Sequence, residues 1–404
     1  MNILFISISS IPDTKLHSIS LDLLREFQRH GHDICILCAL EKTDSKPTYY
    51  SEEEGFKIVR VHIGGNKKAS IIEKGITTVT EPYIYITAIK KYYKNEKFDL
   101  VLYPTPPITQ VKTVEYVKTR DGAKSYLLLR DIFPQNAVDI GMMSKSGFKG
   151  LLYNHFRRVE KILYQVSDYI GCMSQANVDY VLKHNPEIDP TKVEVCPNTI
   201  DVIDKSIDEE TRIVIRKKYG LPLDKMIFVY GGNLGKPQGI PFVMNCMRDC
   251  KDINDVFFVI VGDGTEYEKI DEYTRKENQE NLKLMKKLPK EDYDNLVAAC
   301  DVGLIFLDYR FTIPNFPSRL LSYMQAKIPV LACTDSNTDI GKVITEGGFG
   351  WWCESNDSNA FVDKVQAALD MDLKVAKIAK DKEYQYLLDN YTTKCAYEKI
   401  TKHF

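Results

Sequence analysis

The sequence predicts an α/β protein of two parallel-sheet domains that face a cleft, on two observations. First, short apolar segments rich in β-branched residues alternate with helix-like segments in two series, separated by a polar, turn-rich stretch at residues 198–223. Second, 404 residues exceed the usual size of one core. The expected domains are residues 1–200 and 201–380, and residues 381–404 are expected to form a helix that returns to the first domain.

The strand-like segments of the two series place the sheets. In the first domain the predicted strands are residues 2–7, 34–40, 58–63, 100–103, 125–130, 169–173 and 193–195, and the predicted helices are residues 18–30, 83–93 and 149–166. In the second domain the predicted strands are residues 228–230, 256–261, 282–285, 302–306 and 330–332. Parallel sheets bind ligands beyond the carboxyl ends of their strands, so we expect the site there.

The composition is that of an ordinary globular protein, with 44% hydrophobic and 27% charged residues. A net charge of −2 argues against nucleic acid as a partner. We find no apolar run of the ~18 residues that a membrane span needs, and the N-terminal run lacks the basic segment of a signal peptide. The CxxC pair Cys35 and Cys38 lies in a strand pattern that points the thiols to opposite faces, so buried free thiols in a reducing cytoplasm are expected.

The segment MIFVYGGNLGKPQG, residues 226–239, combines a strand pattern, a glycine-rich turn and a following helix pattern. This arrangement aims free backbone N–H groups and a positive helix end at an anion. Glycine suits such a turn because a Cβ would block the approach of a phosphate to the backbone. Lys236 adds a positive charge within the turn. Glycine turns also serve purely structural roles in α/β proteins, so this segment alone leaves both interpretations open.

Several motifs follow one another in a recognisable order. They are RHGHDICIL (residues 29–37), LLRDIFPQNAVDIG (128–141), CPNTID (196–201), the glycine segment, FFVIVGDGTE (257–266), LPKEDYDNLVAACDVGLIFL (288–307) and FPSRLLSYMQAKIPVLA (316–332). In this order the chain resembles the retaining, GT-B-fold glycosyltransferases of family 4, closest to bacterial enzymes that build capsule, exopolysaccharide or O-antigen units. The resemblance implies two Rossmann-like domains, the first binding the acceptor and the second the sugar nucleotide.

The resemblance also implies which residues hold the donor. Arg319 stands where the family has a cation that neutralises the leaving diphosphate, and charge does build on that phosphate as the glycosidic bond breaks. A surface position on a helix is the alternative for Arg319. The other implied donor-binding residues are Gly232, Asn233, Lys236, Gln238, Gly262, Gly264, Leu288, Pro289, Ser318 and Ser322.

Three departures from the family pattern stand out. The family glutamate that binds the ribose hydroxyls is Ser322 here, and the glutamate eight positions earlier is Pro314. Gln238 replaces a lysine of the glycine turn, and the turn after the first strand, residues 9–18, lacks a glycine pair. Exchanging a carboxylate for a hydroxyl is worth roughly 1.5–3 kcal/mol of donor affinity.

On the acceptor side, Asp131 ends a predicted strand beside Arg130, where relatives have a His-Asp pair. Asp131 is expected to orient or deprotonate the acceptor hydroxyl, or else to cap the turn before Pro134. His17, in the loop after the first strand, is a weaker candidate. The two Asp-x-Asp spacings, at residues 292–294 and 370–372, border helices instead of strand ends, so no catalytic metal is expected.

Residues 145–166 form a basic amphipathic pattern that suits either a domain core or an anionic membrane surface. The core is the favoured interpretation, and the basic, aromatic residues 90–94 add weight to the membrane. The apolar positions of the pattern are Phe148, Leu151, Leu152, Phe156, Val159, Ile162, Leu163 and Val166, and the basic positions are Lys145, Lys149, Arg157, Arg158 and Lys161.

The function implied by the resemblance is retaining transfer of a hexosyl or N-acetylhexosaminyl group from a UDP-sugar to a lipid-linked saccharide, without cofactor or metal. It would take place in the cytoplasm or on the inner face of the cytoplasmic membrane. The alternative is a degenerate, non-catalytic homologue that acts as a partner subunit, which the Ser322 departure keeps open. A sugar-nucleotide epimerase is weaker, because its His- and Glu-containing motifs are not found.

Overall fold

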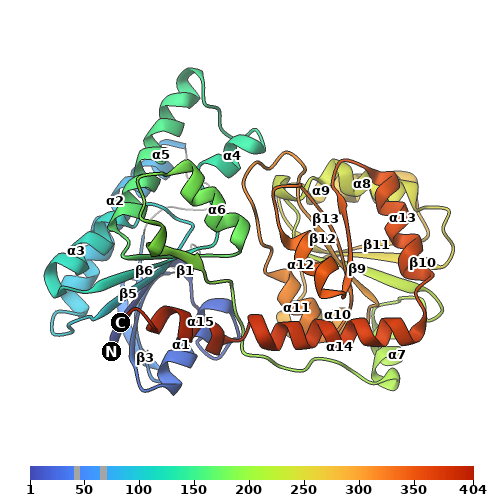
Figure 1. The fold of residues 1–404 in the computed structure, drawn as a ribbon, viewed down its shortest axis with the longest axis horizontal. Coiled ribbons are helices and arrows are strands. Elements are labelled where there is room, and N and C mark those ends of the chain that lie inside the picture. Colours follow the sequence, from blue (N-terminus) through green and yellow to red (C-terminus); the bar gives the residue numbers. More distant parts are fainter. Residues whose placement is uncertain (41–45, 64–70) are drawn as a thin grey trace. The chain divides into compact units, whose positions relative to one another are not determined.

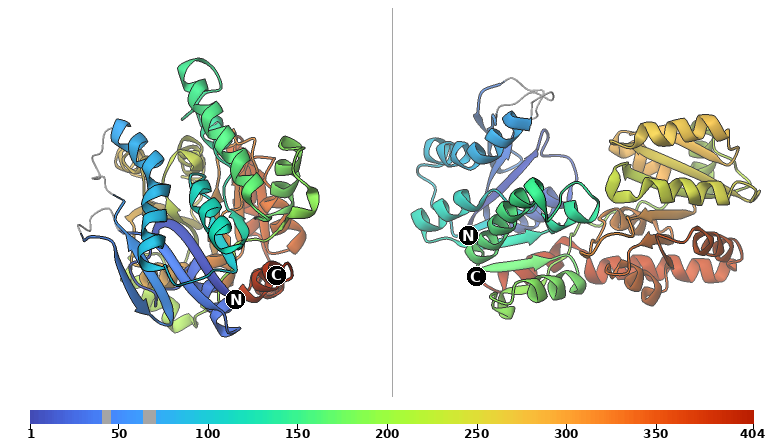
Figure 2. Two further views of the ribbon diagram at one scale, coloured as in Figure 1. Left: turned by 90° about the vertical axis from the view of Figure 1, so that its left-hand side faces the viewer. Right: turned by 90° about the horizontal axis from the view of Figure 1, so that it is seen from above.

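A computed structural model describes residues 1–40, 46–63 and 71–404, and it divides into two compact units (Figure 1). Unit 1 comprises Met1–Asp201 and Thr393–Phe404, and unit 2 comprises Val202–Thr392. Each unit has its own β-sheet flanked by helices, as the two views of Figure 2 also show.

The sheet of unit 1 has the strand order β3-β4-β2-β1-β5-β6-β7-β8, and all neighbours are parallel except β3 and β4. Its strands are β1 (Asn2–Ser10), β2 (Asp33–Ala39), β3 (Tyr49–Glu53), β4 (Phe56–Val61), β5 (Leu100–Pro104), β6 (Lys124–Leu129), β7 (Tyr169–Cys172) and β8 (Val193–Val195). Its helices are α1 (Ile19–Arg29), α2 (Ile71–Tyr92), α3 (Val111–Asp121), α4 (Gln135–Asp139), α5 (Gly147–Val166), α6 (Gln175–His184), η1 (Pro190–Lys192) and α15 (Thr393–Thr401).

Strand β1 lies at the centre of this sheet, hydrogen-bonded to β2 on one side and to β5 on the other. Its apolar run Ile3–Ile6 is buried on both faces, as expected for a parallel strand covered by helices. Helices α2, α3 and α5 pack side by side, and α1 packs with α15. The loops after β1, β5 and β6 therefore leave the same edge of the sheet and are available for a site.

The sheet of unit 2 is entirely parallel, with the order β11-β10-β9-β12-β13-β14. Its strands are β9 (Met226–Asn233), β10 (Val256–Asp263), β11 (Leu282–Lys286), β12 (Val302–Phe306), β13 (Val330–Thr334) and β14 (Gly350–Glu354). Its helices are α7 (Glu209–Lys218), η2 (Lys236–Gln238), α8 (Ile240–Asp249), α9 (Tyr267–Glu277), α10 (Lys290–Ala298), α11 (Arg319–Ala326), α12 (Ile340–Gly347), α13 (Ser358–Leu369) and α14 (Leu373–Asn390).

The predicted strands are all present, and two further strands, β3 and β14, were not predicted. Several helices were not predicted either, among them α3, α4, α6 and α7. Strand β3 is a polar strand at one edge of the unit 1 sheet, beside β4. Strand β14 carries two tryptophans and lies at one edge of the unit 2 sheet, beside β13. Helix α7 lies inside the stretch expected to be a linker. The helix is held to unit 2 by an ion pair from the buried Arg216 to Asp301, at 2.6 Å. Sequence analysis looked for an apolar helix face and therefore missed it.

The single helix predicted for residues 381–404 is wrong, because the chain forms two helices there. Helix α14 ends at Asn390, and α15 begins at Thr393. The backbone N–H of Thr393 donates to the carbonyl of Ile200, and its hydroxyl contacts Glu26 at 3.1 Å. These partners from unit 1 replace the bonds that a continuous helix would make, so α15 joins unit 1 while α14 stays in unit 2.

Candidate functional site

A cavity of about 1080 Å³ opens at the carboxyl ends of the central strands of unit 2. It lies where β9 and β10 end and where helix α11 begins, as parallel-sheet topology predicts. Its lining residues are Gly231, Gly232, Asn233, Val261, Gly262, Asp263, Gly264, Thr265, Lys287, Leu288, Pro289, Lys290, Tyr293, Arg319 and Ser322.

Eight of the predicted donor residues line this cavity, and three do not. Gly232, Asn233, Gly262, Gly264, Leu288, Pro289, Arg319 and Ser322 lie in its wall. Lys236 and Ser318 are exposed residues outside it, and Gln238 is buried behind it. The oxygen Oε1 of Gln238 accepts from the backbone N–H of Gly235 at 3.0 Å, so this residue shapes the loop.

The glycine pair lies in strand β9 and not in the expected turn. Gly232 pairs with Gly262 of the neighbouring strand, and a Cβ on Gly262 would lie 2.0 Å from the carbonyl oxygen of Gly232. A Cβ on Gly264 would lie 2.3 Å from the oxygen of Leu234. Gly232 itself has a φ of +132°, which side chains rarely adopt. The backbones at this end of the sheet therefore pack so closely that only glycine fits.

Arg319 is the first residue of helix α11, and its guanidinium reaches the cavity. The guanidinium carbon lies 4.3 Å from the ring centroid of Tyr230, a buried residue of β9. Nitrogen Nη1 is buried and has no hydrogen-bond partner among the described residues. A cation on an aromatic face, with an unused donor beside a helix N-terminus, is arranged to receive an anion.

The cavity wall carries more positive than negative charge. Its cations are Lys287, Lys290 and Arg319, and its single carboxylate is Asp263. Lys290 pairs with Asp294 at 3.0 Å, while Asp263 accepts from the backbone N–H of Gly264 at 2.9 Å and so shapes its own turn. This balance suits a ligand with two or more negative charges, such as a diphosphate.

In unit 1, Arg130 and Asp131 follow strand β6 directly. The Asp131 carboxyl accepts from the backbone N–H of Ile132 at 2.8 Å and from the amide of Asn136 at 2.7 Å. Burial raises the pKa of Asp131 to about 6 despite these two bonds. A carboxyl with such a pKa can hold or accept a proton near neutral pH.

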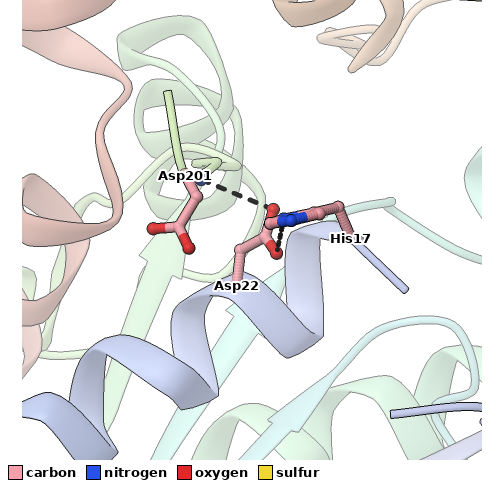
Figure 3. A group of neighbouring side chains, drawn as sticks. All are labelled: His17, Asp22 and Asp201. Carbon is pink, nitrogen blue, oxygen red and sulfur yellow. Dashed lines mark hydrogen bonds and ion pairs between the residues drawn. The ribbon is translucent and has the colours of Figure 1, made fainter. Parts of the chain in front are cut away.

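His17 lies beside Asp22 and Asp201 (Figure 3). In the described part of the chain, these three residues are the cluster whose side chains could together bind a metal ion. His17 Nδ1 is 2.9 Å from Asp22 Oδ1, and the ligand atoms of all three residues lie within 4.8 Å of one another. Arg25 already pairs with Asp22 at 2.7 Å, and Arg29 pairs with Asp201 at 2.6 Å. The two guanidinium groups satisfy these carboxylates without a metal, so the group connects helix α1 to residue 201.

Sequence reasoning missed Tyr230, Tyr293, Lys287 and Lys290. Tyr230 lies two residues before Gly232 in a strand, and this spacing places both on one face of the sheet. That alternation was the available signal, but Tyr230 was assigned to the core. Tyr293 packs beneath the strand end, where a Cβ on Gly231 would lie 2.0 Å from its hydroxyl. Nothing in the spacing of Tyr293 or the lysines indicates the cavity.

Comparison with known proteins agrees with this geometry. Residues 211–385, which contain the cavity, match the family described as glycosyl transferases group 1. The chain is 23% identical over 356 residues to a protein of Pseudomonas aeruginosa named probable glycosyltransferase WbjE, covering 87% of this chain and 85% of that protein.

Solved structures share the fold over the whole chain. The crystal structure of HepE from Anabaena with UDP matches with a TM-score of 0.68 and 13% identity, covering 100% of this chain and 99% of HepE. Sucrose-phosphate synthase from Thermosynechococcus elongatus matches with a TM-score of 0.76 and 13% identity, covering 99% and 97%. The predicted GT-B class of α/β fold is confirmed, and residues 211–385 form a glycosyl transferases group 1 domain. In the described ranges, no helix combines the length and the hydropathy that crossing a membrane would take.

Proposed function

We propose that this protein is a retaining glycosyltransferase that moves a hexosyl or N-acetylhexosaminyl group from a UDP-sugar to a lipid-linked saccharide. The proposal combines the glycosyl transferases group 1 domain with the cavity at the ends of β9 and β10. The UDP in the HepE structure and the glycosyltransferase name of the WbjE relative support the donor and the class of reaction. Its place is the synthesis of a bacterial surface polysaccharide.

The observation that carries the proposal is the Arg319 guanidinium, buried in the cavity with Nη1 unpartnered. As the bond from the anomeric carbon to the diphosphate breaks, the departing oxygen gains negative charge. A fixed cation with a free donor stabilises that charge without reorganisation at the moment of reaction. Arg319, Gly232 and Asn233 are assigned to the diphosphate, and Leu288, Pro289 and Ser322 to the nucleoside.

On the acceptor side, the proposal assigns the proton of the attacking hydroxyl to Asp131. The hydroxyl oxygen bonds to the anomeric carbon on the face that the diphosphate leaves, so the anomeric configuration is retained, and the hydroxyl proton passes to Asp131. The pKa of Asp131, raised by burial to about 6, leaves the group ionised but basic at neutral pH. No metal or cofactor takes part in the scheme.

A non-catalytic homologue that acts as a partner subunit is the second candidate, and Ser322 favours it. Ser322 lines the cavity where the family has a ribose-binding glutamate. Without that carboxylate the nucleotide loses roughly 1.5–3 kcal/mol of binding.

Helix α5 supports peripheral contact with an anionic membrane. Leu151 is 67% exposed and Leu152 48%, and Met142, in the preceding loop, is 61% exposed. Figure 2 shows the first turns of α5 extending away from the sheet of unit 1. Lys145 and Arg158 are exposed nearby, whereas Arg157 pairs with Glu160 at 2.7 Å and Leu163 is core. The side chains of Phe148 and Lys149 lie outside the described residues.

A sedimentation assay with vesicles tests this contact. Wild-type protein is expected to sediment with vesicles containing anionic lipid and not with neutral vesicles. Leu151→Ser with Leu152→Ser should remove most of the binding, and Val375→Ser, an exposed apolar residue of α14, is the matched control. Equal sedimentation of wild type and the double variant would exclude α5 as the contact.

A donor-hydrolysis and transfer assay tests the function itself. Purified protein is incubated with a panel of UDP-, GDP- and dTDP-sugars, with short-chain polyprenyl diphosphate saccharides as acceptors. Nucleoside diphosphate release with one donor, and a product whose anomeric configuration by NMR matches the donor, is the expected result. No turnover with any donor, together with undetectable UDP binding, would favour the partner subunit.

A further inference from the structure

Arg130 is a partly buried cation that has no carboxylate partner among the described residues. Its guanidinium nitrogen Nε is buried and has no hydrogen-bond partner among the described residues. The only side-chain bond that its guanidinium makes there is from Nη1 to the hydroxyl of Ser20, at 3.0 Å. Burial lowers the pKa of Arg130 to about 10. Withdrawing part of an unpaired charge from water is unfavourable, so this guanidinium favours an anionic partner that the described chain does not supply.

The neighbouring carboxylates do not compensate this charge. The Asp131 carboxyl is engaged by the N–H of Ile132 and the amide of Asn136. The Asp22 carboxyl is held by His17 and Arg25. The titratable group that acts on Arg130 is the Cys196 thiol, and burial raises the pKa of that thiol to about 11, so it is neutral at pH 7.

Arg130 also lies against the positive end of a helix. Ser20 is in the first turn of α1, whose N-cap Ser18 accepts from the backbone N–H of Leu21 at 3.2 Å. A helix N-terminus repels a cation and attracts an anion, so the guanidinium and the helix end favour the same ligand.

The backbone that carries Arg130 is fixed before any ligand arrives. The hydroxyl of Thr105, at the end of β5, accepts from the backbone N–H groups of Arg130 at 3.1 Å and of Asp131 at 3.4 Å. Thr105 is buried, so this clamp at the carboxyl edge of the sheet is shielded from water. An anion would therefore meet an arginine whose backbone is held by Thr105 and whose Nη1 is bonded to Ser20, which lowers the entropy cost of binding.

We propose that Arg130 and the first turn of α1 form an anion-binding site in unit 1 that takes a phosphate or pyrophosphate group. The guanidinium fork matches two oxygens of such a group. Resting on the proposed function, the group is the diphosphate of the lipid-linked acceptor or a phosphate of the donor. The site is separate in sequence and in its residues from the cavity that contains Arg319.

Binding of inorganic pyrophosphate, measured by calorimetry on the full chain, tests the site. The background variant is Arg319→Ala, which weakens competition from the unit 2 cavity. The double variant Arg319→Ala with Arg130→Met, which keeps the length of the side chain, should bind pyrophosphate at least about tenfold more weakly than the background. Arg319→Ala with Arg275→Met, at an exposed position, is the charge-matched control and should bind like the background. Equal affinities of the background and the Arg130→Met variant, or no binding to the background, would overturn the proposal.

Two further arms separate the source of the anion and guard against misfolding. Farnesyl diphosphate and UDP are titrated into the same variants. If Arg130→Met weakens binding of farnesyl diphosphate alone, the site belongs to the acceptor, and if it weakens binding of UDP alone, the site belongs to the donor. Unchanged affinity for both ligands overturns the proposal. Arg130→Met should melt no lower than wild type in anion-free buffer, because an unpaired, partly buried charge is removed. These titrations need no turnover, so they succeed or fail independently of the proposed transferase activity.

Discussion

The Arg319 guanidinium lies 4.3 Å from the ring centroid of Tyr230, and the hydroxyl of that ring donates to the backbone oxygen of Asn233 at 2.8 Å. One tyrosine therefore joins the cation of helix α11 to the end of strand β9. The same strand end supplies Gly232 and Asn233 to the cavity wall. The relative position of the cation and the glycine backbone is thus set by a buried aromatic ring.

Replacing Arg319 by alanine should reduce transferase turnover by on the order of 100-fold or more, because the charge that develops on the leaving diphosphate loses its stabiliser. The fold should survive, since the guanidinium contributes an unpartnered donor to the interior. Initial-rate kinetics with a melting curve measure both effects. Arg275→Ala, an exposed arginine outside the site, is the control, and near wild-type turnover of Arg319→Ala would refute the role.

Replacing Tyr230 by leucine should lower kcat/KM about tenfold, because a buried cation–π contact is worth about 1–2 kcal/mol. Tyr230→Phe keeps the ring and should retain most of the activity. A double-mutant cycle with Arg319→Ala distinguishes positioning from general destabilisation. If Tyr230→Leu acts through Arg319, it should cost little more in the Arg319→Ala background, and an undiminished effect there would contradict the idea.

Sequence patterns predicted the strands because parallel strands buried on both faces leave continuous apolar runs, as at β1 and β12. Elements that are held in place by polar contacts do not show such an apolar pattern in the sequence. Helix α7 depends on Arg216 with Asp301, and the start of α15 depends on Thr393 with Glu26 and Ile200. Such pairs join residues far apart in sequence, so local reasoning could not anticipate them.

The site was predictable where backbone chemistry dictates the residue. Gly262 and Gly264 must be glycine because neighbouring carbonyl oxygens leave no room for a Cβ. Residues that act through tertiary contact were not predictable. Tyr230 has the pattern of a core residue, and only the fold shows that its ring supports the Arg319 guanidinium. Lys287 has the pattern of a solvated residue, and only the fold places it in the cavity wall.

Activity should depend on pH through Asp131. Burial raises the pKa of its carboxyl from 3.8 to about 6, so kcat/KM should rise with pH through about 6 and then level off. Asp131→Asn should lack this rise and have much lower activity. Stability should respond in the opposite direction: the folded state keeps its proton between about pH 4 and 6 while the unfolded chain releases it, so wild type loses stability over that window and the variant does not. A wild-type profile flat from pH 5 to 7 would contradict this assignment.

Activity should not require a divalent metal. The aspartates of residues 292–294 are engaged by lysines, Asp292 by Lys218 at 2.7 Å and Asp294 by Lys205 at 2.8 Å. Initial rates are expected to be equal in EDTA and in magnesium. Loss of activity in EDTA that manganese or magnesium restores would show that a carboxylate group binds a metal, and the His17 group would be the first to mutate.

Ser322 lies one helical turn after Arg319 in α11, and both side chains line the cavity. If the protein is a working transferase, its ribose is held by groups weaker than a carboxylate. Ser322→Glu should then tighten UDP binding, by up to about 10- to 150-fold for a gain of roughly 1.5–3 kcal/mol. Calorimetric titration of UDP and GDP into both proteins measures the change.

A glutamate at this position would also lie three residues from Arg319, a spacing at which opposite charges pair on a helix. Ser322→Gln, with the same length and no charge, therefore serves as the matched control. Tighter binding with glutamate but not with glutamine indicates a charged bond to the ribose. Weaker nucleotide binding with glutamate but not with glutamine indicates that the new carboxylate pairs with the Arg319 guanidinium. In that case the cavity has adapted to a serine at position 322 and excludes a negative charge there. Undetectable binding of both nucleotides to all three proteins would remove the transferase proposal and leave the partner subunit, because a cavity that cannot hold the leaving diphosphate cannot stabilise its departure.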